Sequence, residues 1–201
     1  RLPTARSPGG PVYVFAHILA PHPPFVFGPG GEARDVTGPW HISDGNHHHH
    51  GEPAAVAAYV AGYRDQVRHI EDRLLGTVTE IIRRSPRPPV IIIHADHGPG
   101  SRLNHDDPRW TWFPERQAIL HAVLMPDRDY AGFHHAITPV NTFRLLLNRL
   151  GPDTLAPRPD RSYFATWNRP YRHYDVDEWQ APERRIPARV GVVAFRRAPV
   201  Q

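Results

Sequence analysis

The spacing of apolar positions predicts one long helix in the first half of the chain. Within residues 53–84, apolar side chains recur at steps of three and four, which places them on one face of a helix: Val56, Val60, Tyr63, Val67, Ile70, Leu74, Val78 and Ile81. Pro53 suits the first helical position, and Ser85-Pro86 predicts the end. A helix of this length could break at Gly62 or Gly76.

Short apolar runs predict strands before and after this helix. Residues 12–16 (VYVFA) and 89–94 (PVIIIH) are rich in β-branched and aromatic side chains and have the length of buried strands. A strand, a helix and a second strand in this order predict a crossover unit, with 89–94 as a central parallel strand covered on both faces. Residues 118–125 and 190–195 are further strand candidates.

A second, shorter helix is predicted to begin with Thr138 as its N-cap and Pro139 in its first turn. Its apolar face would consist of Phe143, Leu146, Leu147 and Leu150, and Gly151 would end it. Residues 28–53 and 152–187 are expected to be irregular.

Together these elements predict an α/β fold with a mostly parallel sheet and helices on both faces. We expect one partial domain over residues 1–201, with a core at 12–151 and an irregular C-terminal extension at 152–201. We also expect the sheet to be incomplete on its N-terminal side, because the chain begins at Arg1 rather than Met.

Composition narrows the classes of function. The 24 basic residues are all arginine, they exceed the 20 acidic residues by four, and they are scattered singly or in pairs, so nucleic-acid binding is not expected. The absence of cysteine excludes disulfides, thiolate metal ligands and a cysteine nucleophile. No apolar run approaches the ~20 residues of a membrane helix, so any membrane link would come from segments outside these residues.

Candidate chemistry gathers where the strands end. Asp96 and His97 directly follow the isoleucine-rich strand, and a carboxylate beside an imidazole suits a divalent ion such as Zn or Mn. The alternative is that Asp96 caps a turn and His97 occupies a surface niche. His22, held between prolines, could donate a hydrogen bond to an anionic ester, or it could be an ordinary surface histidine.

Other histidines are weaker candidates. His17 and His94 each close an apolar run, where either could orient a metal ligand from outside the coordination shell or simply be half-buried. The run His47–His50 is expected to lie in a solvated loop that binds stray metal rather than in a site of fixed geometry.

The segments PHPPF (21–25), YVAGYRDQVR (59–68) and PPVIIIHADHGPGS (88–101) resemble the sulfatase-like hydrolase and transferase family, which shares the alkaline-phosphatase fold. Residues 115–126, 137–148 and 160–171 look similar to a membrane-bound branch of that family. The resemblance implies that Asp96 and His97 bind a divalent metal ion (Zn, Mn, Mg or Ca) and that His22 contacts the transferred group. It also implies an extracytoplasmic location and an anionic ester substrate, lipid- or glycan-linked.

The chain departs from this family at its beginning. The family nucleophile, a Thr, Ser or formylglycine, and an acidic metal ligand lie near the start of the domain, and we expect neither in this chain. We therefore expect part of an enzyme that cleaves or transfers sulfate or phosphate esters, inactive as this chain alone. The alternative is a non-catalytic remnant of the same fold that binds metal or glycan.

Overall fold

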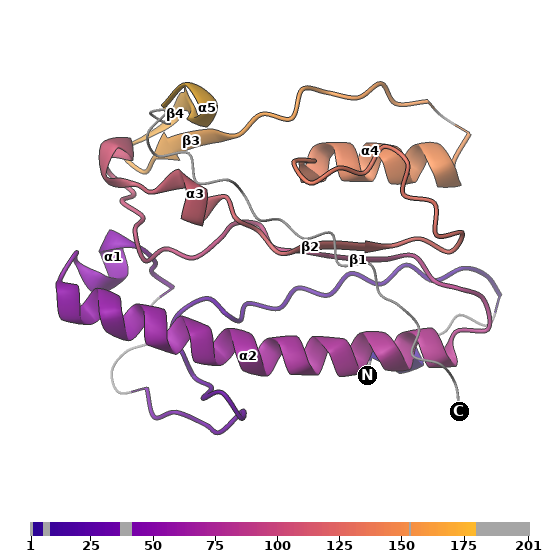
Figure 1. Cartoon of the computed structure of the whole chain (residues 1–201), viewed down its shortest axis with the longest axis horizontal. Helices are drawn as coiled ribbons and strands as arrows, with labels where there is room; N and C mark the ends of the chain where they lie inside the picture. The colour runs from indigo at the N-terminus through magenta and orange to yellow at the C-terminus, as the bar shows by residue number, and fades with distance from the viewer. Residues whose placement is uncertain (1, 6–8, 37–41, 153, 180–201) are drawn as a thin grey trace. The chain divides into compact units, whose positions relative to one another are not determined.

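The computed structural model describes residues 2–5, 9–36, 42–152 and 154–179, which form two compact units. The first unit consists of residues 1–89 with 99–104, and the second of residues 90–98 with 105–201. The chain therefore enters the second unit at Val90, returns to the first at Pro99 and enters the second again at His105. Figure 1 labels the elements of both.

The first unit is built on one long helix. It contains η1 (Leu2–Thr4), α1 (Asn46–His49) and α2 (Pro53–Arg84). Both ends of the predicted long helix are confirmed, because α2 begins at Pro53 and ends at Arg84 without a break at either glycine (Figure 1). Proline at the first helical position has no N–H that would need an intrahelical partner, which explains why it begins the helix cleanly.

The most buried row of α2 differs from the apolar stripe that its sequence indicates. Its buried residues are Tyr59, Gly62, Gln66 and Val78, of which only Val78 belongs to the predicted stripe. Gly62 is buried because Phe25 packs on it, and an added Cβ would come within 3.0 Å of that ring. A search for apolar side chains overlooks a row that contains glycine and glutamine.

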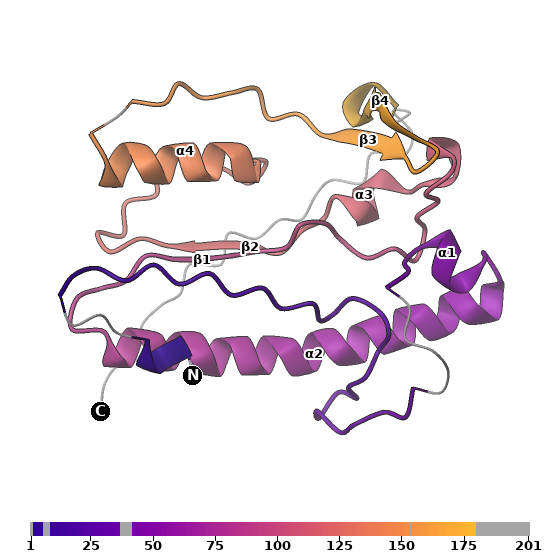
Figure 2. The same ribbon diagram turned by 180° about the vertical axis from the view of Figure 1, so that it is seen from behind.

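Residues 12–16 do not form the predicted strand, and that prediction is wrong. They are extended but unpaired (Figure 2), and their side chains are exposed, with Tyr13 at 84% and Phe15 at 75% of the maximum. β-Branched and aromatic residues favour an extended backbone, but a strand also needs a hydrogen-bonding neighbour. The described part of the first unit contains only an isolated bridge between Phe27 and Ala33.

The second unit contains two small antiparallel pairs. β1 (Ile91–His94) pairs with β2 (His121–Leu124), so that Ile91 lies opposite Leu124 and His94 opposite His121. β3 (Tyr163–Thr166) pairs with β4 (Arg169–Asp175). The remaining elements are η2 (Pro108–Trp110), α3 (Phe113–Arg116), α4 (Pro139–Leu150) and α5 (Val176–Trp179).

The predicted alkaline-phosphatase-like fold, with a mostly parallel sheet, is contradicted. Every strand pair among the described residues is antiparallel and each sheet has two strands, so β1 is not a central parallel strand. The run of isoleucines identified a strand, but composition does not determine the direction of its partner. The side chains of Ile91–Ile93 are only half-buried, as a two-stranded ribbon allows.

The predictions for the C-terminal part were mixed. The bounds of α4 are confirmed, including Thr138 and Gly151 as flanking residues. Residues 152–187 were expected to be irregular, and this was wrong for the β3–β4 hairpin and for α5. The strand predicted at 190–195 lies outside the described residues.

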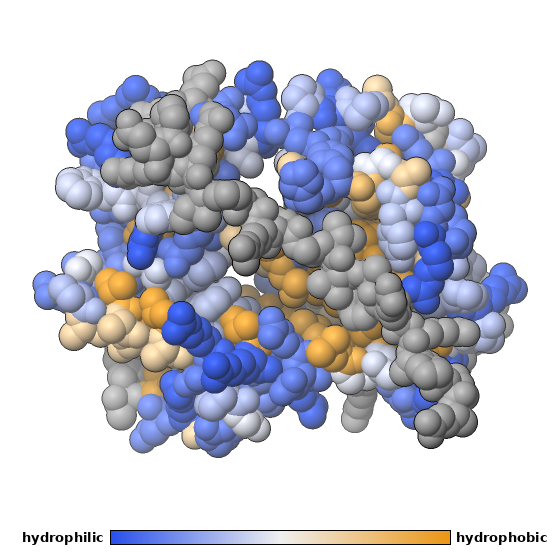
Figure 3. All heavy atoms as spheres, viewed as in Figure 1, coloured by the Kyte–Doolittle hydropathy of each residue, from blue (hydrophilic) through white to orange (hydrophobic). Residues whose placement is uncertain are grey.

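Several large apolar side chains reach the surface in both units. Figure 3 shows hydrophobic atoms, in orange, exposed on the face in view. Within the described ranges, no helix is both long enough and apolar enough to cross a bilayer.

Candidate functional site

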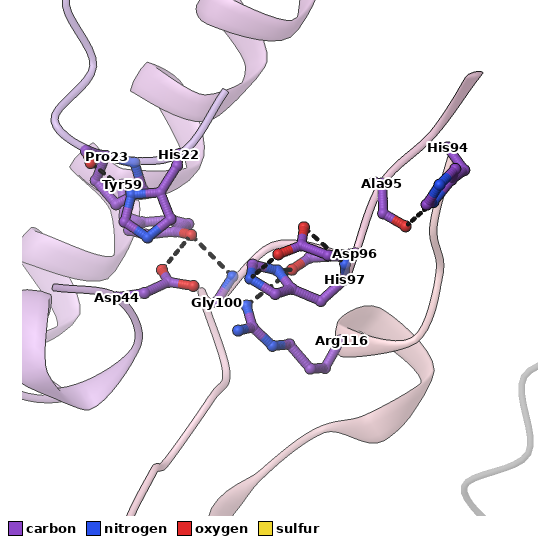
Figure 4. Close-up of polar contacts among 11 residues, drawn as sticks. His22, Pro23, Asp44, Tyr59, His94, Ala95, Asp96, His97, Gly100 and Arg116 are labelled. Carbon is purple, nitrogen blue, oxygen red and sulfur yellow. Dashed lines mark hydrogen bonds and ion pairs between the residues drawn. The ribbon is translucent and has the colours of Figure 1, made fainter. Parts of the chain in front are cut away.

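The turn after β1 presents Asp96 and His97 together. The His97 Nε2 atom lies 3.4 Å from the Asp96 Oδ2 atom, and the backbone N–H of His97 donates to Asp96 Oδ1 at 3.0 Å. Figure 4 shows these two side chains on the same turn. The Asp96 side chain is 83% exposed and that of His97 34%. A carboxylate oxygen and an imidazole nitrogen therefore lie side by side and open to solvent in the second unit.

The other ring nitrogen of His97 determines which tautomer is present. Nδ1 lies 2.9 Å from the carbonyl oxygen of Gly98, which can only accept, so Nδ1 carries the proton of the neutral ring. The lone pair is then on Nε2, the atom that faces Asp96. A backbone carbonyl that orients an imidazole in this way is the usual support of a histidine metal ligand.

Arg116 of helix α3 forms hydrogen bonds to the same turn at Gly98. Arg116 Nη1 donates to the Gly98 carbonyl at 2.9 Å, and the Gly98 N–H donates to the Arg116 carbonyl at 2.6 Å. Gly98 is buried, and an added Cβ would come within 3.0 Å of the backbone oxygens of Glu115 and Ala118. Glycine is therefore needed here for close backbone approach.

In the first unit, α2 holds the segment that carries His22. Gln66 accepts hydrogen bonds at its Oε1 from the N–H groups of Val26 (2.8 Å) and Phe27 (3.3 Å). Its Nε2 donates to the carbonyl of His22 at 3.2 Å. The buried amide thereby anchors both ends of the loop, while His22 Nδ1 lies 2.6 Å from the carbonyl of Pro23.

A buried polar cluster in the first unit was missed by the sequence analysis. Tyr59 Oη donates to the buried Asp44 Oδ1 at 2.7 Å and accepts from the Gly100 N–H at 2.8 Å (Figure 4). Tyr59 lies on the predicted helix, but it falls outside the apolar stripe, and Asp44 lies in a segment expected to be irregular. The partners are 15 and 41 residues apart, so no local spacing marks them.

The histidine run does not form the expected solvated loop. Three of its members lie in α1, and His49 is only 4% exposed. The ring of His48 packs edge-on against Phe25 and Tyr59, with centroids 6.2 and 5.7 Å apart. Burial lowers the pKa of His48, while the Asp44 carboxylate acts in the opposite direction and neighbouring histidines, including His22, add to the lowering.

The two weaker candidates lie apart from these clusters. His17, in the first unit, is exposed, with its ring centroid 6.4 Å from that of Phe15. His94, in the second unit, is exposed at the end of β1, 6.4 Å from the ring of His121 and 5.9 Å from that of Phe143. Neither has a hydrogen bond to Asp96 or His97, and their predicted supporting role stays a prediction.

The structure thus brings Asp96 and His97 together in the second unit, while His22 belongs to the first. Among the described residues, no group of three or more His, Asp or Glu side chains is arranged to hold a metal ion. The pair therefore supplies two adjacent candidate ligand atoms and no more. Comparisons with protein-family models, with curated proteins and with solved structures found no match to this chain.

Proposed function

We propose that Asp96 and His97 bind a divalent metal ion as part of an enzyme that cleaves or transfers phosphate or sulfate esters. The observation that carries this proposal is the 3.4 Å separation between His97 Nε2 and Asp96 Oδ2. Two ligands bound at about 2.0–2.1 Å to one tetrahedral ion lie about 3.4 Å apart, so the pair has the spacing of adjacent ligands.

The hydrogen bonds around the pair support a cation between the two atoms. In the tautomer whose Nδ1–H donates to the Gly98 carbonyl, the Nε2 lone pair faces a carboxylate oxygen. Two lone pairs at this distance repel unless a proton or a cation lies between them. The exposed turn leaves space for further ligands, such as water or substrate oxygen.

The proposed chemistry gives a role to the metal ion and to one further residue, His22. A bound divalent ion would polarise an ester oxygen and stabilise negative charge. For His22, whose Nδ1 faces the Pro23 carbonyl, a contact with the transferred anionic group is proposed from the resemblance of the PHPPF segment alone. The substrate class, a phosphate or sulfate ester on a lipid or glycan at the extracytoplasmic face of a membrane, rests on the family resemblance of the PHPPF and HADHGPG segments. It does not rest on the fold.

Metal titration of the full chain tests the proposal. We expect Mn²⁺, followed by the EPR signal of the free ion, to bind the wild type and to bind Asp96→Asn and His97→Ala at least tenfold more weakly. Asp127→Asn and His135→Ala, which change exposed residues of the same types in the same unit, are the matched controls. Equal binding by wild type and Asp96→Asn would refute the metal site.

Turnover separates the enzyme from the non-catalytic alternative. The longest form of the protein that can be expressed should hydrolyse aryl phosphates or aryl sulfates only with metal present and with Asp96 intact. Metal binding that depends on Asp96, combined with no turnover of either ester by that form, would instead favour a binding role for metal or glycan.

A further inference from the structure

Both backbone polar groups of Gly100 are held by side chains of the first unit. Its N–H donates to Tyr59 Oη at 2.8 Å, and its carbonyl lies 3.2 Å from His49 Nε2. All four of these groups are in buried surroundings. Side-chain hydrogen bonds thus hold the two successive peptide units that flank the Gly100 Cα atom.

The side chains that make these bonds are themselves held in place. His49 Nδ1 accepts from the Gly51 N–H at 3.0 Å, so the ring proton is on Nε2, which can donate to the Gly100 carbonyl. Tyr59 donates its own proton to Asp44, which leaves its oxygen to accept from Gly100. In these four hydrogen bonds the Tyr59 hydroxyl thus donates to Asp44 and accepts from Gly100, while the His49 ring accepts from Gly51 and donates to Gly100.

Gly100 also lies too close to this cluster for any larger residue. An added Cβ would come within 3.0 Å of both carboxylate oxygens of Asp44. The segment continues along the same surface, because the Asn46 N–H donates to the Leu103 carbonyl at 2.8 Å and the Leu103 N–H to that of Gly100 at 3.2 Å. Several hydrogen bonds thus hold the backbone of residues 100–103 in place.

Only Gly98 and Pro99 separate Gly100 from His97 along the chain. Pro99 has a fixed φ, so two residues give the backbone little freedom to absorb a displacement of Gly100. We propose that Tyr59, with Asp44, and His49 are positioning residues that hold the C-terminal end of the metal-binding turn. This inference rests on the proposed metal-binding function of Asp96 and His97.

Mn²⁺ binding by variants of Tyr59 and His49 in the full chain tests this role. Tyr59→Phe should weaken Mn²⁺ binding roughly tenfold, and His49→Phe likewise, because a ligand whose supporting contacts are lost binds metal about 10–100-fold more weakly. His49→Gln keeps an N–H donor near the position of Nε2 and should recover most of the affinity. Tyr171→Phe removes a hydroxyl from a tyrosine that is 94% exposed and should change nothing.

The measurements are made at a temperature where circular dichroism shows every variant folded, so that loss of stability alone does not change the affinity. Rescue by His49→Gln but not by His49→Phe supports the positioning role. If Mn²⁺ binding depends on Asp96 while Tyr59→Phe and His49→Phe bind like wild type, the positioning role is wrong and the metal site stands. If binding does not depend on Asp96, the proposed function itself has failed.

Discussion

At the scale of single residues, Gly98 and Gly100 are needed for close packing rather than for an unusual backbone conformation. Neither has φ in the left-handed region, yet a Cβ on either would overlap a neighbour. At Gly98 the neighbours are backbone carbonyl oxygens, which cannot move aside as the end of a flexible side chain can. The turn that carries Asp96 and His97 therefore tolerates no side chain at this position.

Gly98→Ala should destabilise the protein by about 1–3 kcal/mol, the usual cost of forcing extra atoms into a packed site. It should also weaken the hydrogen bond from the Gly98 N–H to the Arg116 carbonyl. Chemical denaturation measures the loss. Gly76→Ala is the control, because Gly76 lies in α2 with nothing within 4 Å of an added Cβ, and there alanine should stabilise by up to about 1 kcal/mol. Equal effects of the two changes would contradict this account.

Some candidate residues were identifiable from the sequence and others were not. Asp96 and His97 are adjacent and follow an apolar run, so local pattern was enough to select them. Asp44 and Tyr59 make their contacts across long loops, and their residue types are common. A buried acid of this kind is recognised only when its partner is known.

At the scale of elements, two asparagines on the same face of α4, Asn141 and Asn148, join the helix to the segment after it. Asn141 donates to the Arg158 carbonyl at 2.7 Å and accepts from its N–H at 2.9 Å. Asn148 pairs in the same way with Leu155, at 3.0 and 2.6 Å. Each side-chain amide thus pairs with the N–H and the carbonyl of one residue in a segment that is not part of a strand. The face predicted to be apolar is instead exposed at Phe143, Leu147 and Leu150, while Asn141, on the opposite side of the helix, is buried.

Asn148→Ala should remove both hydrogen bonds to Leu155 and cost about 1–3 kcal/mol, since two backbone groups lose their partners. Amide hydrogen exchange should become faster at Leu155. Arg144→Ala, which removes one exposed hydrogen bond to the Ala156 carbonyl, should cost less than about 1 kcal/mol. An unchanged exchange rate at Leu155 in Asn148→Ala would contradict the proposed role of the amide.

The cap of α4 comes from a distant residue. Thr138 occupies the predicted N-cap position but makes no side-chain cap. Asp160 Oδ1 instead accepts from the Thr138 N–H at 2.7 Å and from Asn141 Nδ2 at 2.9 Å. Burial alone would raise the pKa of Asp160, but these hydrogen bonds and nearby His134 more than offset it and lower the pKa overall.

Asp160→Ala should therefore destabilise the protein by about 1–2 kcal/mol, the usual value of an N-cap. Because the pKa of Asp160 is lowered by folding, the ionised carboxylate stabilises the folded protein above the ordinary pKa of aspartate. This stabilisation is lost as the pH falls through the lower pKa that Asp160 has in the folded protein. The difference in the free energy of unfolding between wild type and Asp160→Ala should therefore become smaller in acid. Urea denaturation at pH 7 and near pH 3 measures both values, and a difference that grows in acid would contradict this role.

At the scale of the whole molecule, each unit contains a histidine whose pKa is lowered by folding. Burial lowers the pKa of His48 in the first unit, and burial followed by the nearby His94 lowers that of His121 in the second. His121 Nε2 lies 3.1 Å from Thr142 Oγ1 on α4, and the Thr142 hydroxyl also donates to the Thr138 carbonyl.

Stability should fall as the pH drops below the ordinary histidine pKa of about 6.5, because the unfolded chain then binds protons that the folded rings do not. Above that pH, the contribution of His48 and His121 to the free energy of unfolding should be complete. Replacing His48 or His121 by Gln should each make the free energy of unfolding less dependent on pH between 7.5 and 5.5. His135→Gln, at an exposed position, should leave the dependence unchanged, and a steeper dependence in His121→Gln would contradict the assignment.

The sequence alone determined the features that depend on neighbouring residues. It predicted both ends of α2 and of α4, the extended character of the run that contains β1, and the adjacent Asp96 and His97. Helix ends follow from proline and glycine chemistry, and helix length from periodicity, so these features need no knowledge of the rest of the molecule.

Only the tertiary structure decided which partner each strand has and which polar groups are buried. It paired β1 with β2 in the antiparallel direction, left residues 12–16 unpaired, and placed Asp44, Tyr59 and His49 around Gly100. The reason is physical. Strand pairing and buried hydrogen bonds join atoms that are far apart along the chain, and their free energy depends on what is excluded from water, which composition and spacing do not specify.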